Sequence, residues 1–195
     1  MSAEDRREQL TEVARELFAE RGYAASSMEE IAERAGVSKP VVYEHFAAKD
    51  AIYKVIVDRE VRGLVDRIKA ALEPGHPRRT ISRAVDAFLE YIEDEQAGFK
   101  ILVRDSPVGT GDGSRSLPSV LDEIARAVEL LLRRELRDRG FSVKMAPILA
   151  RSLVGMIALP GQWWLDAGRL QRKYVADQIV NLAWNGLGGL RNEPD

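Results

Sequence analysis

SMEEIAERAGVSKPVVYEHFAAK, residues 27–49, contains two short helical patterns separated by a single glycine. Ser27 and Glu30 have the S-x-x-E spacing of a capping box, which satisfies backbone N–H groups at the start of a helix. Gly36 permits the left-handed backbone that commonly ends a helix, and Ser38 is a good N-cap for the next one. Two short helices joined by a tight turn predict a helix-turn-helix, in which the second helix enters the major groove of DNA. The alternative is an ordinary helical hairpin.

The second of these helices, residues 38–46, carries most of the side chains that we expect to contact DNA. The side chains expected at base edges or thymine methyl groups are Ser38, Lys39 and Val42. The side chains expected at phosphates are Ser26 or Ser27, Tyr43, His45 and Lys49. The pattern leaves open whether Val41 or Val42 turns inward to pack with Phe46.

Residues 10–52 resemble the N-terminal domain of the TetR family of bacterial transcriptional regulators. The residues that match the family pattern are Ala14, Leu17, Phe18, Gly22, Tyr23, Met28, Ile31, Ala32, Ala35, Gly36, Val37, Ser38, Val42, Tyr43, His45, Phe46, Lys49 and Asp50. The resemblance implies a dimer that binds DNA through this domain and a small molecule through a second one. Glu44 departs from the pattern, because an acid beside the DNA-facing surface repels phosphate.

The rest of the chain predicts further helices and no strands. The expected helical segments are 51–72, 81–97, 99–103, 118–139, 145–167 and 174–187, and Ser106–Ser116 is expected to be a mobile surface loop. With the first three helices this gives an all-α protein of about nine helices. We expect residues 1–50 to form the helix-turn-helix DNA-binding domain, and residues 51–195 to form a larger helical domain for ligand binding and dimerisation.

Composition argues against several other classes of protein. The 195 residues contain no cysteine, so disulfides and thiolate metal sites are excluded. His45 and His76 lie far apart, and we expect neither a metal nor another cofactor. The sequence contains no nucleophile motif and no acid–base pair of the kind that enzymes use, so we expect that the protein is not an enzyme. The N-terminus is charged and no run of about 18 apolar residues occurs, so the sequence predicts a cytoplasmic protein that does not enter a membrane.

The charge of the expected DNA-binding domain is unusual for that role. Residues 1–50 carry seven Lys and Arg against eleven Asp and Glu, a net charge of −4, whereas the whole chain carries −2. A broad basic surface, the usual electrostatic signature of a nucleic-acid binder, is therefore absent. We expect binding to depend on a few concentrated contacts, with a shallow salt dependence for one domain and tight binding only as a dimer.

The last two expected helices, 145–167 and 174–187, are apolar on more than one face. Such helices need a second surface to cover them, and a four-helix bundle between two copies of the chain would provide one, as the family resemblance also implies. The residues expected at this dimer interface are Leu153, Ile157, Trp164, Val175, Ile179, Leu182, Ala183 and Gly186. The alternative is that both helices form the centre of a monomer's core.

Aromatic and aliphatic side chains of the second domain suggest a cavity for a small molecule. The residues expected to line it are Phe88, Tyr91, Phe99, Leu102, Leu121, Ile124, Val128, Met156, Leu159 and Trp163. Pro160 and Gly161 are expected to interrupt a helix where the cavity requires a bend. Because few charged residues are available to meet an ionic molecule, we expect an apolar or aromatic effector.

These features predict a ligand-responsive transcriptional regulator that acts as a repressor. A homodimer is expected to bind a palindromic operator in double-stranded DNA and to be released by its effector. The alternatives are a ligand-independent architectural protein that binds DNA through its helix-turn-helix, and a transcriptional activator.

Overall fold

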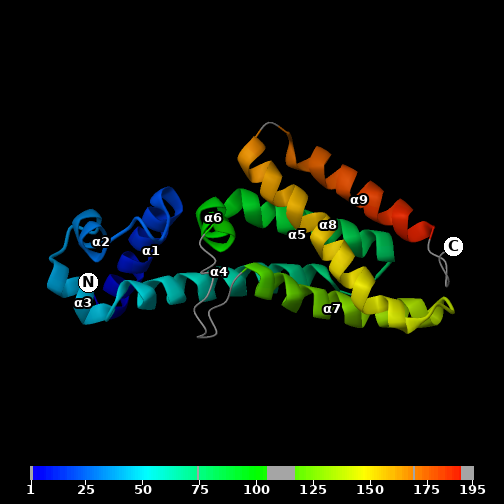
Figure 1. Cartoon of the computed structure of the whole chain (residues 1–195), viewed down its shortest axis with the longest axis horizontal. Coiled ribbons are helices and arrows are strands. Elements are labelled where there is room, and N and C mark those ends of the chain that lie inside the picture. Colours follow the sequence, from blue (N-terminus) through cyan, green and yellow to red (C-terminus); the bar gives the residue numbers. More distant parts are fainter. Residues whose placement is uncertain (1, 74, 105–116, 169, 190–195) are drawn as a thin grey trace. The chain divides into compact units, whose positions relative to one another are not determined.

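The computed structural model describes residues 2–73, 75–104, 117–168 and 170–189, and every regular element in these ranges is helical (Figure 1). The α-helices are α1 (Ala3–Arg21), α2 (Met28–Arg34), α3 (Lys39–His45), α4 (Lys49–Ala71), α5 (Pro77–Asp94), α6 (Gln96–Arg104), α7 (Leu117–Asp138), α8 (Ala146–Ala167) and α9 (Arg172–Gly188). A short 3-10 helix, Val143–Met145, precedes α8. These nine α-helices of the described ranges confirm the expected all-α class. The loop expected at Ser106–Ser116 lies outside them.

The helix bounds follow the sequence pattern with two informative differences. α5 begins at Pro77, four residues before the expected start at 81. A proline in the first turn costs little, because the N–H that it lacks would have no acceptor within the helix. α8 runs through Pro160 and Gly161 to Ala167, so the expected interruption of this helix is wrong.

The described residues form two compact units. The N-terminal unit contains residues 2–62, 95–104 and 117, and the C-terminal unit contains residues 63–73, 75–94, 118–168 and 170–189. The chain therefore passes from the first unit to the second within α4, and returns to the first between α5 and α6. The assignment of DNA binding to residues 1–50, and of ligand binding and dimerisation to 51–195, concerns function and stays a prediction.

The N-terminal unit is built on one apolar stripe of α1. The fully buried residues of this stripe are Leu10, Ala14, Leu17 and Phe18. The Tyr23 ring packs on Tyr53, with ring centroids 4.6 Å apart, and on Phe18, so it belongs to the same core. α6 follows the first 62 residues in the sequence, yet it packs on α1 and contributes the buried side chains of Phe99 and Ile101 to this core.

The predicted cap and turn of the helix pair are both present. The Ser27 hydroxyl accepts the Glu30 N–H at 3.2 Å, and the Glu30 carboxylate accepts the Ser27 N–H at 2.9 Å. Gly36 has a φ of 65°, a conformation that a side chain would strain, and it turns the chain between α2 and α3. The two helices pack against each other, as a helix-turn-helix requires.

The C-terminal unit packs α5 against both α8 and α9. Gly161 permits the close approach of α5 to α8, because a Cβ atom there would lie 2.5 Å from Cε1 of Phe88 and 2.9 Å from Cδ1 of Ile92. Such separations are too short for non-bonded carbon atoms. The glycine is therefore explained by packing between two helices rather than by a break in α8.

Candidate DNA interface and ligand cavity

α3 has one buried side and one exposed side. Val42 is fully buried and Phe46 follows it into the same core, whereas Tyr43 is 44% exposed. Ser38 and Lys39 are exposed where the helix begins. A short helix that is held from behind by apolar contacts and presents polar and aromatic side chains outward has the geometry of a recognition helix.

The burial of Val42 corrects one predicted DNA contact. Since none of its side chain is exposed, it does not reach a base edge in this conformation. Ser26 is buried too, and its hydroxyl donates to the carbonyl oxygen of Gly22 at 2.8 Å. Of the two serines proposed to hold a phosphate, Ser27 is therefore the more accessible, although its hydroxyl already caps α2.

The Ser38 hydroxyl makes no cap bond because of the proline two residues later. Ser38 occupies the N-cap position of α3, yet its side chain accepts no backbone N–H. Pro40 has no N–H to donate, and the Val41 N–H donates instead to the carbonyl oxygen of Ser38 at 3.0 Å. The exposed hydroxyl is thus available for a hydrogen bond to DNA.

Lys39 is engaged by an acid of the preceding helix. Its ammonium donates a hydrogen bond to the Glu29 carboxylate and lies 5.8 Å from the centre of the Tyr43 ring. The hydrogen bond raises the pKa of Lys39 above its ordinary value and lowers the pKa of Glu29. Because both side chains are more than half exposed, the pair is weak. The Glu29 carboxylate therefore competes with a base or a phosphate for the Lys39 ammonium.

Lys49 ties α4 to the loop between α1 and α2. Its ammonium donates to the carbonyl oxygens of Tyr23 and Ser26 at 2.8 Å and 2.7 Å, and it lies 4.3 Å above the centre of the Tyr23 ring. These contacts stabilise the framework behind the recognition helix. The predicted phosphate contact of Lys49 stays a prediction.

Arg7 supports the end of α3, a role that the sequence pattern does not reveal. Its guanidinium donates to the carbonyl oxygen of His45 at 2.5 Å and lies 4.1 Å above the centre of the Phe46 ring. Arg7 and His45 are 38 positions apart, and no helical spacing or motif connects them. The predicted phosphate contact of the half-buried His45 side chain stays a prediction.

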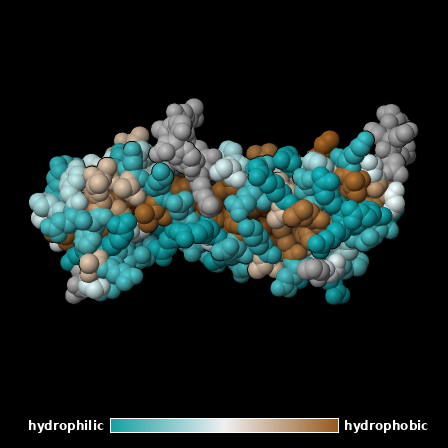
Figure 2. Space-filling model, turned by 90° about the horizontal axis from the view of Figure 1, so that it is seen from below, coloured by the Kyte–Doolittle hydropathy of each residue, from teal (hydrophilic) through white to brown (hydrophobic). Residues whose placement is uncertain are grey.

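A cavity of about 330 Å³, partly open to solvent, lies in the C-terminal unit. Its lining is mostly apolar and comes from α4, α5, α7, α8 and α9 together with the segments that join them. Figure 2 shows apolar side chains at the surface of this unit, among polar ones.

The polar side chains in the lining are those of Thr80, Arg134, Glu135 and Arg139. Glu135 and Arg139 neutralise each other through a hydrogen bond of 2.7 Å. Size and lining suit a small, largely apolar molecule.

Only part of the predicted cavity lining reaches this cavity. The predicted residues that line it are Phe88, Leu121, Ile124 and Val128. Phe99 and Leu102 are buried in the N-terminal unit, and Tyr91 is buried beneath the Arg67 guanidinium. The remaining three, which belong to α8, are the half-buried Met156 and the exposed Leu159 and Trp163.

The two faces of α8 are exchanged relative to the prediction. Leu153 and Ile157, which we expected at a dimer interface, line the cavity, whereas Leu159 and Trp163 are 68% and 57% exposed. The other predicted interface residues that are buried within the chain are Trp164, Val175, Ile179 and Ala183. The exposed ones are Leu182 and Gly186. Ile148 and Tyr174 are further exposed apolar side chains, and neither is among the predicted interface residues.

Comparison with known proteins identifies both parts of the chain. Residues 10–56 match the family model described as bacterial regulatory proteins, tetR family, and residues 77–186 match the model described as tetracyclin repressor-like, C-terminal domain. The HTH-type transcriptional activator FasR of Mycolicibacterium smegmatis is 33% identical over 186 residues, which cover 94% of this chain and 84% of that protein.

Solved structures share the fold over nearly the whole chain. A TetR-like transcriptional regulator from Rhodococcus sp. RHA1 has 27% sequence identity and a TM-score of 0.77, and the match covers 95% of this chain and 97% of that one. AibR, solved in complex with isovaleryl coenzyme A and operator DNA, has a TM-score of 0.74 over 91% of this chain and 97% of its own. At 19% identity, that second likeness shows the fold alone.

An outward-facing recognition helix in one unit and an apolar cavity in the other are the features of a DNA-binding regulator that responds to a ligand. The chain belongs to the TetR family of bacterial regulatory proteins. It is a ligand-responsive transcriptional regulator, and the family resemblance of residues 10–52 is confirmed.

Replacement of Glu29 by glutamine is expected to strengthen operator binding about two- to fivefold, because Lys39 no longer has an ion pair to break. The operator fragment for this measurement is selected with the full-length protein from a random DNA library, and the dissociation constant is read by fluorescence anisotropy. Glu33→Gln removes the same charge from α2 at an exposed position that does not pair with Lys39. Equal gains in the two variants would show that overall charge, and not release of Lys39, sets the affinity.

Proposed function

We propose that this protein binds a palindromic operator as a homodimer in the cytoplasm, with α3 of each subunit in a major groove, and leaves it when a small molecule occupies the C-terminal cavity. The observation that carries the DNA contact is the exposure of Ser38, Lys39 and Tyr43 on a helix whose other side is fully buried. Ser38 and Lys39 meet base edges, and the Tyr43 hydroxyl meets a phosphate.

The effector is an apolar molecule, aliphatic or aromatic. The lining supports this choice, because Glu135 and Arg139 neutralise each other, Arg134 is the one further charged side chain among the described residues of the lining, and most other contacts are made by hydrocarbon. A ligand changes operator affinity only if it binds one conformer of the protein better than the other. Effector binding therefore favours a conformer in which the two recognition helices no longer match adjacent half-sites.

Repression is the first candidate for the biological effect. In that case the protein blocks transcription while it is bound to the operator, and its release relieves the block. Activation is the second candidate. The observation that favours it is the 33% identity to FasR, which is a transcriptional activator. Both candidates use the same DNA contact and the same cavity, and they differ in where the operator lies relative to the promoter.

The homodimer forms through the outer faces of α8 and α9. Ile148, Leu159 and Trp163 lie at positions of α8 that repeat with helical spacing, and all three are more than half exposed. Tyr174 and Leu182 are exposed in the same way on α9. The segment Val143–Ala167 is long and apolar enough to cross a membrane by length and composition. Its inner side lines the cavity and packs on α5, so a second protein surface is the better cover for its outer side.

The cavity predicts a direct link between ligand occupancy and operator release. A panel of medium-chain fatty acids, aromatic acids and uncharged aromatic compounds is screened by thermal shift and by anisotropy on the selected operator. A true effector at one hundred times its Kd adds about 2.7 kcal/mol to the stability and weakens operator binding. Val128→Trp fills the cavity and is expected to abolish both effects while operator binding persists. Leu130→Trp, on the exposed side of α7, is expected to preserve them. A panel without a single hit, or an unchanged response in Val128→Trp, would contradict the proposal.

Replacement of Leu159 by glutamate is expected to convert the dimer into a monomer at micromolar concentration, since a charge buried in an apolar interface lacks a partner. Sedimentation velocity gives the mass, and anisotropy is expected to show at least a tenfold loss of operator affinity. Leu130→Glu introduces the same charge at a similarly exposed leucine of α7 and is expected to stay dimeric. A monomeric wild type, or wild type that sediments with lipid vesicles, would contradict the proposed interface.

A further inference from the structure

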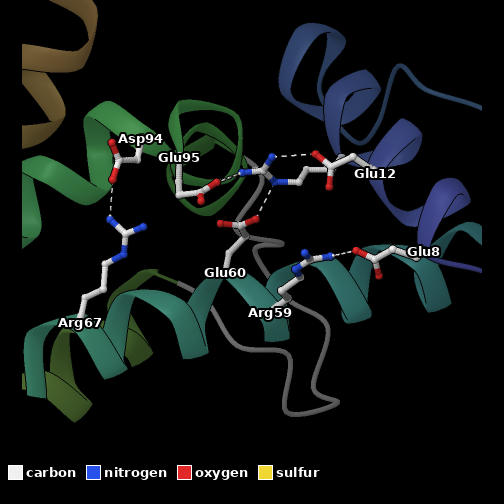
Figure 3. Close-up of polar contacts among 8 residues, drawn as sticks. Glu8, Glu12, Arg59, Glu60, Arg67, Asp94 and Glu95 are labelled. Carbon is white, nitrogen blue, oxygen red and sulfur yellow. Dashed lines mark hydrogen bonds and ion pairs between the residues drawn. The ribbon is translucent and has the colours of Figure 1, made fainter. Parts of the chain in front are cut away.

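Four charged side chains meet where α1, α4 and the start of α6 come together. Figure 3 shows the carboxylates of Glu12, Glu60 and Glu95 around one guanidinium. All three carboxylates pair with Arg15, so this guanidinium is that of Arg15. Arg15 donates from Nε to Glu60 at 2.6 Å, from Nη2 to Glu95 at 2.5 Å and from Nη1 to Glu12 at 2.9 Å. The carbonyl oxygen of Glu95 accepts the N–H of Phe99 at 2.9 Å, which fixes Glu95 to the first turn of α6. One guanidinium therefore joins three helices of the N-terminal unit.

The three bonds differ in how easily they break. The side chains of Arg15 and Glu60 are only 13% and 6% exposed, whereas that of Glu95 is 37% exposed. Burial by itself lowers the pKa of Arg15, but the charges and hydrogen bonds of Glu60 and Glu12 together outweigh it, and the pKa is raised above its ordinary value. The Arg15–Glu60 pair is therefore a permanent part of the unit. The Arg15–Glu95 bond faces water, as the Arg15–Glu12 bond does, and is cheaper to break than the Arg15–Glu60 bond. Its loss leaves Arg15 paired with two other carboxylates.

α6 is fitted to this cluster at Gly98. A Cβ atom on Gly98 would lie 1.9 Å from Oε2 and 2.1 Å from Cδ of Glu60. The buried carboxylate thus lies directly against the backbone of α6, and no larger residue fits there unless one of the two moves. The position of α6 on α1 depends on this fit together with the Arg15–Glu95 bond.

The residue before Glu95 is held in a similar way in the other unit. Asp94, the last residue of α5, accepts a hydrogen bond from Arg67 of α4 at 2.9 Å (Figure 3). α5 also carries Phe88, which lines the cavity less than two turns before Asp94. Two consecutive acids at the junction of α5 and α6 are therefore each bound by an arginine, Asp94 within the C-terminal unit and Glu95 within the N-terminal unit.

We infer that the Arg15–Glu95 bond is a positioning contact that holds the N-terminal unit in its operator-binding conformation and is given up when the cavity is occupied. The second half of this inference rests on the proposed ligand cavity. A contact made in only one of two conformers shifts the equilibrium between them by its own free energy. By linkage, its loss changes the affinities for operator and for cavity ligand in opposite directions.

Glu95→Gln is the test variant, and Glu12→Gln is its matched control. Both remove a half-exposed carboxylate bonded to Arg15, but Glu12 belongs to the same helix as Arg15 and cannot hold α6. Glu95→Gln is expected to weaken operator binding about three- to fivefold and to strengthen binding of the uncharged fluorescent probe 1-N-phenylnaphthylamine by a similar factor. Glu12→Gln is expected to change neither affinity more than about twofold. Both variants are expected to keep a melting temperature near that of the wild type, so that a change in either affinity does not reflect loss of folded protein, and the gain in probe affinity is the readout that a purely structural role would not produce for Glu95.

Gly98→Ala perturbs the same contact from the other side. Alanine stabilises most exposed helix positions relative to glycine, yet here its Cβ atom displaces the Glu60 carboxylate, so operator binding is expected to weaken as in Glu95→Gln. Wild-type operator affinity in Glu95→Gln, or equal losses in Glu95→Gln and Glu12→Gln, would overturn the inference. Failure of the probe to bind the wild type would count against the ligand cavity, and the comparison on operator DNA would then decide the inference by itself.

Discussion

The burial of the Glu60 carboxylate is the constraint on which the N-terminal unit depends. A charge with 6% of its side chain exposed persists only with a partner of opposite sign, and Arg15 of α1 supplies it at 2.6 Å. Removal of one member of such a buried pair typically costs about 3–5 kcal/mol, because the other is left without compensation. The same carboxylate lies against Gly98, so α6 also has to fit around it. α1, α4 and α6 are thereby fixed relative to one another.

α1 extends this fixed framework to the DNA-binding surface. Arg7, two turns before Arg15, holds the end of α3 through the His45 carbonyl oxygen and the Phe46 ring. The apolar stripe of α1 packs the core behind the helix-turn-helix. The first half of α1, at Arg7, therefore contacts the end of the recognition helix, and the middle of α1, at Arg15, contacts the residue that precedes α6. Neither Arg7 nor Arg15 belongs to the motif that identifies the fold. A change at α6 can reach α3 through a single helix.

The local features of the motif were predictable from the sequence because neighbouring residues determine them. The Ser27–Glu30 capping box and the positive φ of Gly36 arise within a few residues, and both are present. Contacts between distant residues were not predictable in this way. Arg15 and Glu95 are 80 positions apart, and their residue types alone do not pair them. The burial of Val42 was left open, since Val41 and Val42 are chemically alike and adjacent.

The cavity shows a second limit of sequence reasoning. α8 is apolar on two sides, so its periodicity predicts that both sides are covered but not which one faces inward. Leu153 and Ile157 line the cavity while Leu159 and Trp163 face outward, and the choice between them follows from the packing of α5 against Gly161. Similarly, Phe99 and Leu102 are apolar enough to line a ligand pocket, but they lie in the core of the N-terminal unit, where α6 packs on α1.

Hydrogen–deuterium exchange of the full-length protein, free and bound to its selected operator, tests most directly whether α6 belongs to the DNA-binding machinery. If α6 is coupled to the recognition helix through Arg15, operator binding slows exchange of the amides of Gln96–Arg104 as well as those of α2 and α3, although α6 has no predicted DNA contact. Protection confined to α2 and α3, with exchange in α6 unchanged, would contradict this coupling.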